Sequence, residues 1–199
     1  YTNTESILEI AKGFGWKTTS EKESVLNYVA EEVNLDQEDA FSVESVKIPY
    51  AKGHTVEYKY NNETGRYTRW SKGKKMFDET TDEPITTKNI IITFAENYTL
   101  SDSENKGRQG LKNIGTFDGY YITNGKAIEI KCIKSSRTSQ TIYKDLKGNE
   151  IEVNDGNTFI RIYPKKGELT ITPKVEEVVT EPELTPEERN SYLIAIVEE

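Results

Sequence analysis

The feature that most constrains the fold is a hairpin pattern near the middle of the chain. Residues 118–123 and 126–134 are strand-like, and Asn124-Gly125 separates them. Asn-Gly suits a two-residue type I′ turn, because both central residues of that turn need positive φ. The returning strand places its apolar residues on one face: Ile128, Ile130 and Cys132. We therefore predict a tight antiparallel hairpin whose apolar face, with the only cysteine, is buried.

Further segments of strand length surround this hairpin. They lie at residues 43–48, 55–60, 66–70, 90–94, 141–143, 151–153, 158–163 and 168–172. Turn-forming Gly, Asn and Asp separate most of them. Short strands at this spacing are typical of antiparallel sheet, and the continuous apolar run at 90–94 predicts a central strand.

Helical patterns lie before and after the strands. Apolar residues recur at helical spacing over residues 4–15, which predicts an N-terminal helix. A patchier stripe, rich in β-branched side chains, predicts a second helix over 20–34. An acidic, proline-containing linker at 174–185 precedes a predicted tail helix at 186–199. The predicted fold class is α+β, mainly antiparallel β-sheet, with residues 1–173 forming the β-rich domain, an N-terminal helix and a C-terminal tail helix.

Most of the net charge lies in the C-terminal segment. The chain has 26 basic and 34 acidic residues and a net charge of −8, of which residues 174–199 carry −6 and residues 1–173 only −2. No basic stripe suited to a nucleic-acid backbone is present, so nucleic acid is not an expected partner. No apolar run approaches the roughly 18 residues of a membrane span. The tail helix is expected to dock on its own domain or on another domain or chain.

The sequence lacks the residue patterns of common catalytic and metal sites. A single His, His54, and a single Cys are too few for a protein zinc site or a disulfide. No G-x-S-x-G, H-E-x-x-H or P-loop motif occurs. We therefore predict no catalytic residue, no metal ligand and no cofactor.

A hydroxyl-rich segment follows the hairpin and is the first candidate binding site. Within residues 134–141, one arginine lies among five Ser and Thr side chains, and the candidate ligands are Ser136, Arg137 and Thr138. A guanidinium with hydroxyls and backbone amides is suited to holding a carboxylate, a phosphate or a sugar. The alternative is that the hydroxyls cap a turn and the arginine pairs with a neighbouring acid.

Aromatic residues on the predicted strands form the second candidate site. The chain has 12 tyrosines, and the strand residues that we single out are Tyr58, Tyr60, Trp70 and Tyr120. Exposed Tyr and Trp provide contact surfaces for carbohydrate or protein. Cross-strand aromatic pairs that stabilise the sheet are the alternative.

Several short motifs occur in an order that is similar to a known family. They are YTNTE at 1–5, VEYKY at 56–60, GRYTR at 65–69, KNIII at 88–92, GYYITNGK at 119–126, SRT at 136–138, KGNEI at 147–151, GNTFI at 156–160 and YP at 163–164. In these motifs the chain resembles the C-terminal part of the YerB-like lipoproteins, an uncharacterised family found mainly in Gram-positive bacteria. The resemblance covers about residues 1–173.

The resemblance implies a location outside the cytoplasm and an attachment to the membrane through a lipid anchor outside this chain. It also implies an additional N-terminal domain, and it provides no catalytic residues. The sequence departs from the family at Cys132, where Trp is usual, and at Phe77, in a stretch that often carries His.

Together these observations favour a non-enzymatic accessory domain that contacts another protein or a cell-wall component. The alternative is part of a cell-wall-acting enzyme whose active site is shared with the additional N-terminal domain, with Arg137 binding substrate. A third hypothesis assigns the tail helix to assembly.

Overall fold

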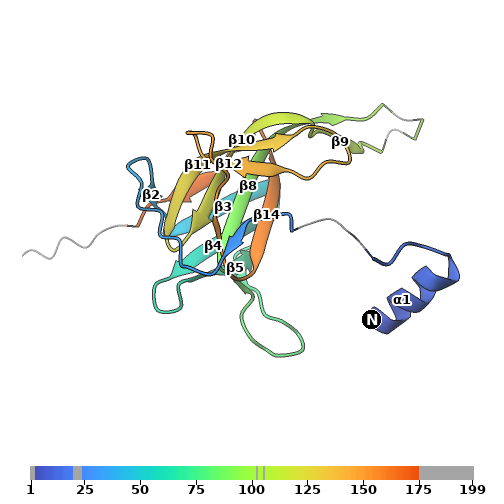
Figure 1. Ribbon diagram of the computed structural model, residues 1–199, viewed down its shortest axis with the longest axis horizontal. Helices are drawn as coiled ribbons and strands as arrows, with labels where there is room; N and C mark the ends of the chain where they lie inside the picture. The colour runs from blue at the N-terminus through green and yellow to red at the C-terminus, as the bar shows by residue number, and fades with distance from the viewer. Residues whose placement is uncertain (1–2, 20–23, 102, 105, 175–199) are drawn as a thin grey trace, which may run out of the picture.

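The structure is a computed structural model and describes residues 3–19, 24–101, 103–104 and 106–174 (Figure 1). Over these residues it contains one helix, two large β-sheets and a short parallel pair of strands. The predicted tail helix at 186–199 and nearly all of the linker before it lie outside the described residues.

Helix α1 (Thr4–Gly13) confirms the predicted N-terminal helix. Its N-cap is Asn3, whose side chain accepts a hydrogen bond from the Ser6 amide at 2.8 Å. Gly15, with φ of 63°, turns the chain away after the helix. Figure 1 shows α1 standing apart from the sheets. No helix over the described residues is long and apolar enough to cross a membrane.

The second predicted helix, at 20–34, is wrong over the described residues 24–34. This segment is mostly irregular, and its only regular element is the strand β1 (Tyr28–Val29). Strand β1 pairs in parallel with β13 (Val153–Asn154). Pairing with a distant part of the chain therefore outweighs the local helical spacing, as the β-branched content of the segment allows.

The central hairpin forms as its turn sequence predicts. Asn124 and Gly125 have φ of 50° and 73°, and the two long strands pair without a register shift along their whole length. Among the described residues these strands belong to a seven-stranded sheet with the order β12-β11-β10-β8-β14, in which β2 also pairs with β11 and β9 with β8. Its members are β2 (Phe41–Ser42), β8 (Asn89–Thr99), β9 (Gln109–Lys112), β10 (Gly115–Thr123), β11 (Lys126–Lys134), β12 (Ile142–Lys144) and β14 (Thr158–Pro164).

A six-stranded sheet covers one face of the first sheet. In the described residues its order is β15-β3-β4-β5-β6, with β7 paired to β5. Its members are β3 (Ser45–Ala51), β4 (His54–Asn61), β5 (Arg66–Ser71), β6 (Lys74–Lys75), β7 (Thr86–Thr87) and β15 (Thr170–Thr172). The prediction of a mainly antiparallel sheet is confirmed, although β14 lies parallel to its neighbour β8.

The seven-stranded sheet is apolar on both faces, which we call inner and outer. The inner face packs on the six-stranded sheet, and the core between them includes Val46, Ile48, Val56, Tyr67, Ile90, Ile92 and Ile122. On the outer face a second core includes Ile91, Tyr121, Ile128, Ile130, Cys132 and Tyr143. Leu26, Leu35 and Ile151 from irregular segments, and Val153 from β13, cover this second core.

Candidate functional site

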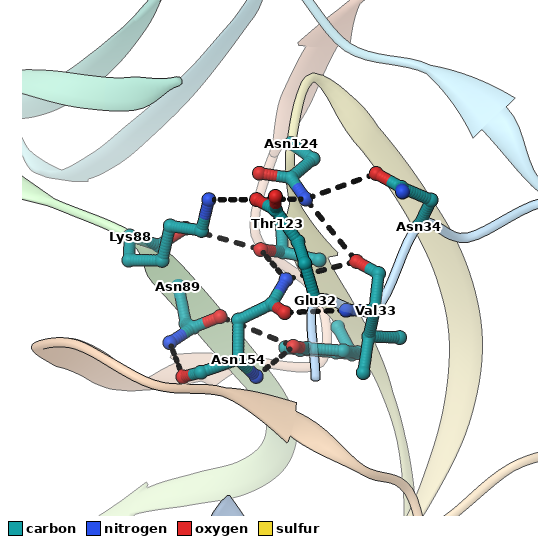
Figure 2. A network of polar contacts seen from close by, with 9 residues as sticks. Glu32, Val33, Asn34, Lys88, Asn89, Thr123, Asn124 and Asn154 are labelled. Atoms are coloured by element: carbon teal, nitrogen blue, oxygen red, sulfur yellow. Dashed lines mark hydrogen bonds and ion pairs between the residues drawn. The ribbon is translucent and has the colours of Figure 1, made fainter. Parts of the chain in front are cut away.

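The cover of the outer face is fixed by a buried polar network, centred on Asn154 (Figure 2). The Asn154 side chain accepts from the Val33 amide at 2.6 Å and donates to the Val33 carbonyl at 2.9 Å. It also donates to the Thr123 hydroxyl at 2.9 Å. Asn154 therefore mimics a strand partner for Val33 and holds the covering segment against the end of the hairpin.

Asn89 and Tyr121 complete the buried part of this network. The Asn89 side chain donates to the Asn154 carbonyl at 2.8 Å and accepts from the Tyr121 hydroxyl at 3.1 Å. That hydroxyl in turn accepts from the Asn154 amide at 3.1 Å. Burial raises the pKa of Tyr121 to about 12, so the phenol stays a neutral donor at ordinary pH.

A solvent-exposed layer of the same network ties the hairpin turn to the covering segment. The Asn124 side chain donates to Glu32, to the Val33 carbonyl and to the Asn34 side chain at 3.1–3.2 Å. Glu32 also pairs with Lys88 Nζ at 2.6 Å, which holds the pKa of its carboxyl below the usual value. Because these polar groups bind one another, the network holds the fold together.

The other half of the outer face is open, and a pocket of about 230 Å³ lies on it. We call it the outer pocket; its lining residues are Thr93, Ala95, Asn113, Phe117, Lys134, Thr141, Tyr143, Ile160 and Ile162. Ile160 and Ile162, on edge strand β14, are 41% and 44% exposed. Five of the nine lining side chains are apolar or aromatic, and the exposed isoleucines are two of them.

The predicted hydroxyl-rich segment lies at the rim of the outer pocket, because Lys134 and Thr141 flank it and line the pocket. Ser136 and Ser139 cap one another: each amide donates to the other residue's hydroxyl, at 2.9 and 3.0 Å. Lys134 Nζ also donates to the Ser139 carbonyl. The serines therefore cap a turn, as the alternative interpretation expects, and Ser136, Arg137 and Thr138 are exposed on it.

The predicted aromatic residues do not gather at this pocket. Tyr58 is fully buried between the sheets, so its ring is not available as a contact surface. Tyr60 packs on Tyr67, its cross-strand neighbour, with ring centroids 5.0 Å apart. Tyr120 contacts Phe41 and Phe94 edge-on, and the Trp70 ring lies under Lys59 Nζ at 4.6 Å. These contacts fit the alternative of aromatic packing that supports the sheets.

Cys132 is buried beside the outer pocket, as predicted. It accepts a hydrogen bond from the Thr93 hydroxyl, with the oxygen and sulfur 3.2 Å apart, and burial raises its pKa to about 11. A thiol in this environment is unreactive at neutral pH. Phe77, the other departure from the family, is 47% exposed and lies beside Lys75 Nζ.

Sequence reasoning missed the residues that form the outer pocket. A signal was present, because β14 is apolar on both faces: Phe159 and Tyr163 point to the inner core, while Ile160 and Ile162 point outward. A strand of this kind is normally covered on both sides. The sequence alone does not show which cover is absent.

Residues 46–160, more than half of the chain, match a known family, described as "Protein of unknown function (DUF3048) C-terminal domain". The chain belongs to this DUF3048 family. This match, together with one sequence relative and its crystal structure, confirms the resemblance to the YerB-like family.

One relative, YerB of Bacillus subtilis, matches the chain both in its sequence and in its crystal structure. A Bacillus subtilis (strain 168) protein, YerB, whose name provisionally classes it as a lipoprotein, is 25% identical over 179 residues, which are 88% of this chain and 48% of that protein. The crystal structure of YerB protein from Bacillus subtilis matches with a TM-score of 0.68 and 22% identity, over 86% of this chain and 54% of that one. The chain thus spans about half the length of the relative that it matches.

Proposed function

We propose that this DUF3048 domain is a non-enzymatic binding domain of an extracytoplasmic lipoprotein, with the outer pocket as its contact site. The name of the relative YerB supports the lipoprotein part. The open half of the outer face supports the binding part, because a pocket lies there whose lining is mainly apolar and aromatic and includes two exposed isoleucines. In this proposal the protein contacts the membrane only through a lipid anchor that lies outside residues 1–199.

A protein suits the outer pocket better than a cell-wall glycan does. Ligand pockets for small molecules usually measure about 300–1,000 Å³, so a pocket of about 230 Å³ is better matched to one apolar side chain of a partner. In the described residues β14 is also an edge strand, paired only with β8, and its free side offers backbone groups to an extended chain. Lys134 and the exposed turn add a polar rim.

The test compares two isoleucines of equal exposure. Ile162 lines the outer pocket, whereas Ile142 of β12 points to the other side of the sheet, and each is 44% exposed. The immobilised domain and its variants Ile162→Glu and Ile142→Glu are offered solubilised envelope proteins and, separately, purified sacculi of Bacillus subtilis. Far-UV circular dichroism checks that both variants are folded.

We expect a defined envelope protein to be retained by the wild type and by Ile142→Glu, and to bind again when purified. Its affinity for Ile162→Glu should fall roughly 30-fold, which is the loss of about 2 kcal/mol expected at the centre of an interface. Retention of sacculi instead of protein would identify a cell-wall component as the partner. The proposal fails if the wild type retains neither, or if Ile162→Glu binds as well as Ile142→Glu.

A further inference from the structure

Two arginine side chains converge on the Tyr58 hydroxyl between the sheets. Arg161 of β14 donates from Nε to the Tyr58 oxygen at 2.7 Å and donates again from Nη2. Arg69 of β5 lies close enough to the same hydroxyl to influence its pKa. Both guanidinium carbons also lie near the Phe159 ring, 5.8 Å from its centroid for Arg69 and 4.9 Å for Arg161. The two cations therefore occupy one region between β5 and β14.

No carboxylate among the described residues compensates the charge of this arginine pair. Within the described part of the chain, neither Arg69 nor Arg161 forms an ion pair with a carboxylate. Tyr58 does not supply the charge, because burial raises the pKa of its phenol and keeps it protonated. Arg161 acts against that rise without reversing it.

Arg69 also has a hydrogen-bond donor without a partner among the described residues. Its Nε is buried with no acceptor, and its Nη1 donates to Met76 Sδ at 2.9 Å, a weak acceptor. Two half-buried guanidinium groups with an unfilled donor cost stability, and apolar side chains would fill the same space at a lower cost. Packing and hydrogen bonding account for Arg161, which donates to Tyr58, but they do not account for the unfilled donor of Arg69.

We propose that Arg69 and Arg161 form a binding site for a doubly charged oxyanion, either a phosphate group or two carboxylates of one ligand. Guanidinium groups present paired N–H donors that match the oxygens of phosphate and carboxylate. Two of them match a ligand charge of about −2 and leave no net charge in the occupied site. The site is separate from the outer pocket, because Arg161 points to the inner face and its neighbours Ile160 and Ile162 to the outer face.

The direct test observes the Nε–H signals of Arg69 and Arg161 by NMR in the wild-type chain. The chain is titrated at pH 7.5 with sodium phosphate, sodium malonate or sodium acetate, each against sodium chloride of matched ionic strength. We expect a saturable shift of both signals with phosphate or malonate, and about tenfold weaker binding of acetate. A response to phosphate alone or to malonate alone identifies which oxyanion chemistry the site takes. No saturable shift with either dianion, or equal binding of acetate, overturns the proposal.

Variants supply an independent readout. Arg69→Gln and Arg161→Gln should each weaken dianion binding at least about tenfold. Arg66→Gln is the matched control, because Arg66 lies on the same strand as Arg69 but bonds to Asn157, at 3.1 Å. In low salt without a dianion, Arg69→Met should melt at or above the wild-type temperature, and below it in saturating phosphate. A lower melting temperature in both conditions would assign Arg69 to stability alone, and the wild-type titration decides the matter if a variant does not fold.

Discussion

Asn154 is the residue whose loss should most clearly separate the outer cover from the sheet. Its side chain is 2% exposed and makes three hydrogen bonds, two with the Val33 backbone and one with Thr123. Asn154→Ala removes all three and leaves the Val33 amide, 121 positions away in sequence, without its acceptor. The backbone bonds of residue 154 to Tyr121 and Asn89 do not depend on its side chain.

The expected cost follows from these three bonds. A hydrogen bond contributes about 1 kcal/mol net, and an orphaned buried amide adds to the loss, so Asn154→Ala should lower the free energy of unfolding by about 3 kcal/mol. For a chain of this length, that corresponds to a fall in melting temperature of roughly 6–12 °C. Urea unfolding measures the total, and hydrogen exchange measures the protection of the Val33 amide, which should fall along with that of its neighbours in 24–36.

Asn97→Ala provides the control. Asn97 is an exposed asparagine on β8, whose side chain makes a single 3.1 Å bond to Gln109, so its removal should cost under about 0.5 kcal/mol. The reasoning is refuted if Asn154→Ala costs no more than Asn97→Ala. It is also refuted if the variant loses stability while the Val33 amide keeps its protection, because the network would then not be what holds the cover.

Two further predictions concern the seven-stranded sheet. A Cβ added at Gly119 would lie 2.2 Å from the Ile92 carbonyl oxygen, so Gly119→Ala should lower the free energy of unfolding, measured in urea, by more than about 2 kcal/mol. Gly13→Ala is the control: its Cβ would meet open space at the end of α1, so the change should be neutral or slightly stabilising. Burial raises the pKa of the Cys132 thiol from 9 to about 11, so the protonated thiol stabilises the fold fully below pH 9, and this stabilisation is lost as the pH rises toward 11. Between pH 8 and pH 10 the free energy of unfolding of the wild type should therefore fall by about 1 kcal/mol more than that of Cys132→Ala. Equal falls in the two proteins would contradict a buried thiol.

Local patterns were sufficient to predict the elements that depend on local interactions. The hairpin was predictable because Asn124-Gly125 adopts positive φ almost regardless of its surroundings. Helix α1 was predictable because its apolar stripe lies within the helix itself. Local patterns did not predict the structure of segment 24–34, because that structure depends on Asn154 and Val153, which are more than 100 residues away.

The spacing of the strand-like segments also did not predict that β14 runs parallel to its neighbour. Turn residues precede and follow it, so a chain of hairpins was the natural expectation, yet β14 pairs in parallel with β8 from Thr158 to Pro164. The connection back to β8 passes through β13 and the Asn154 network rather than through a tight turn. Two parallel neighbouring strands need a long connection between them, and the length of that connection does not indicate which strand will be the neighbour.

Tyr58 shows why the proposed binding sites were harder to predict than the strands. Period-two spacing places its side chain on the same face of β4 as Val56, but the spacing does not show that this face points into the core. The partner of its hydroxyl is Arg161, which lies 103 residues later in the sequence and on the other sheet. In the sequence, Arg161 only interrupts the apolar face that Phe159 and Tyr163 form on β14. The packing of the two sheets is what places its charge against the buried Tyr58 phenol. An arginine on an otherwise apolar strand face is therefore a sequence signal for the proposed oxyanion site, and Arg69, two residues after the buried Tyr67, carries the same signal.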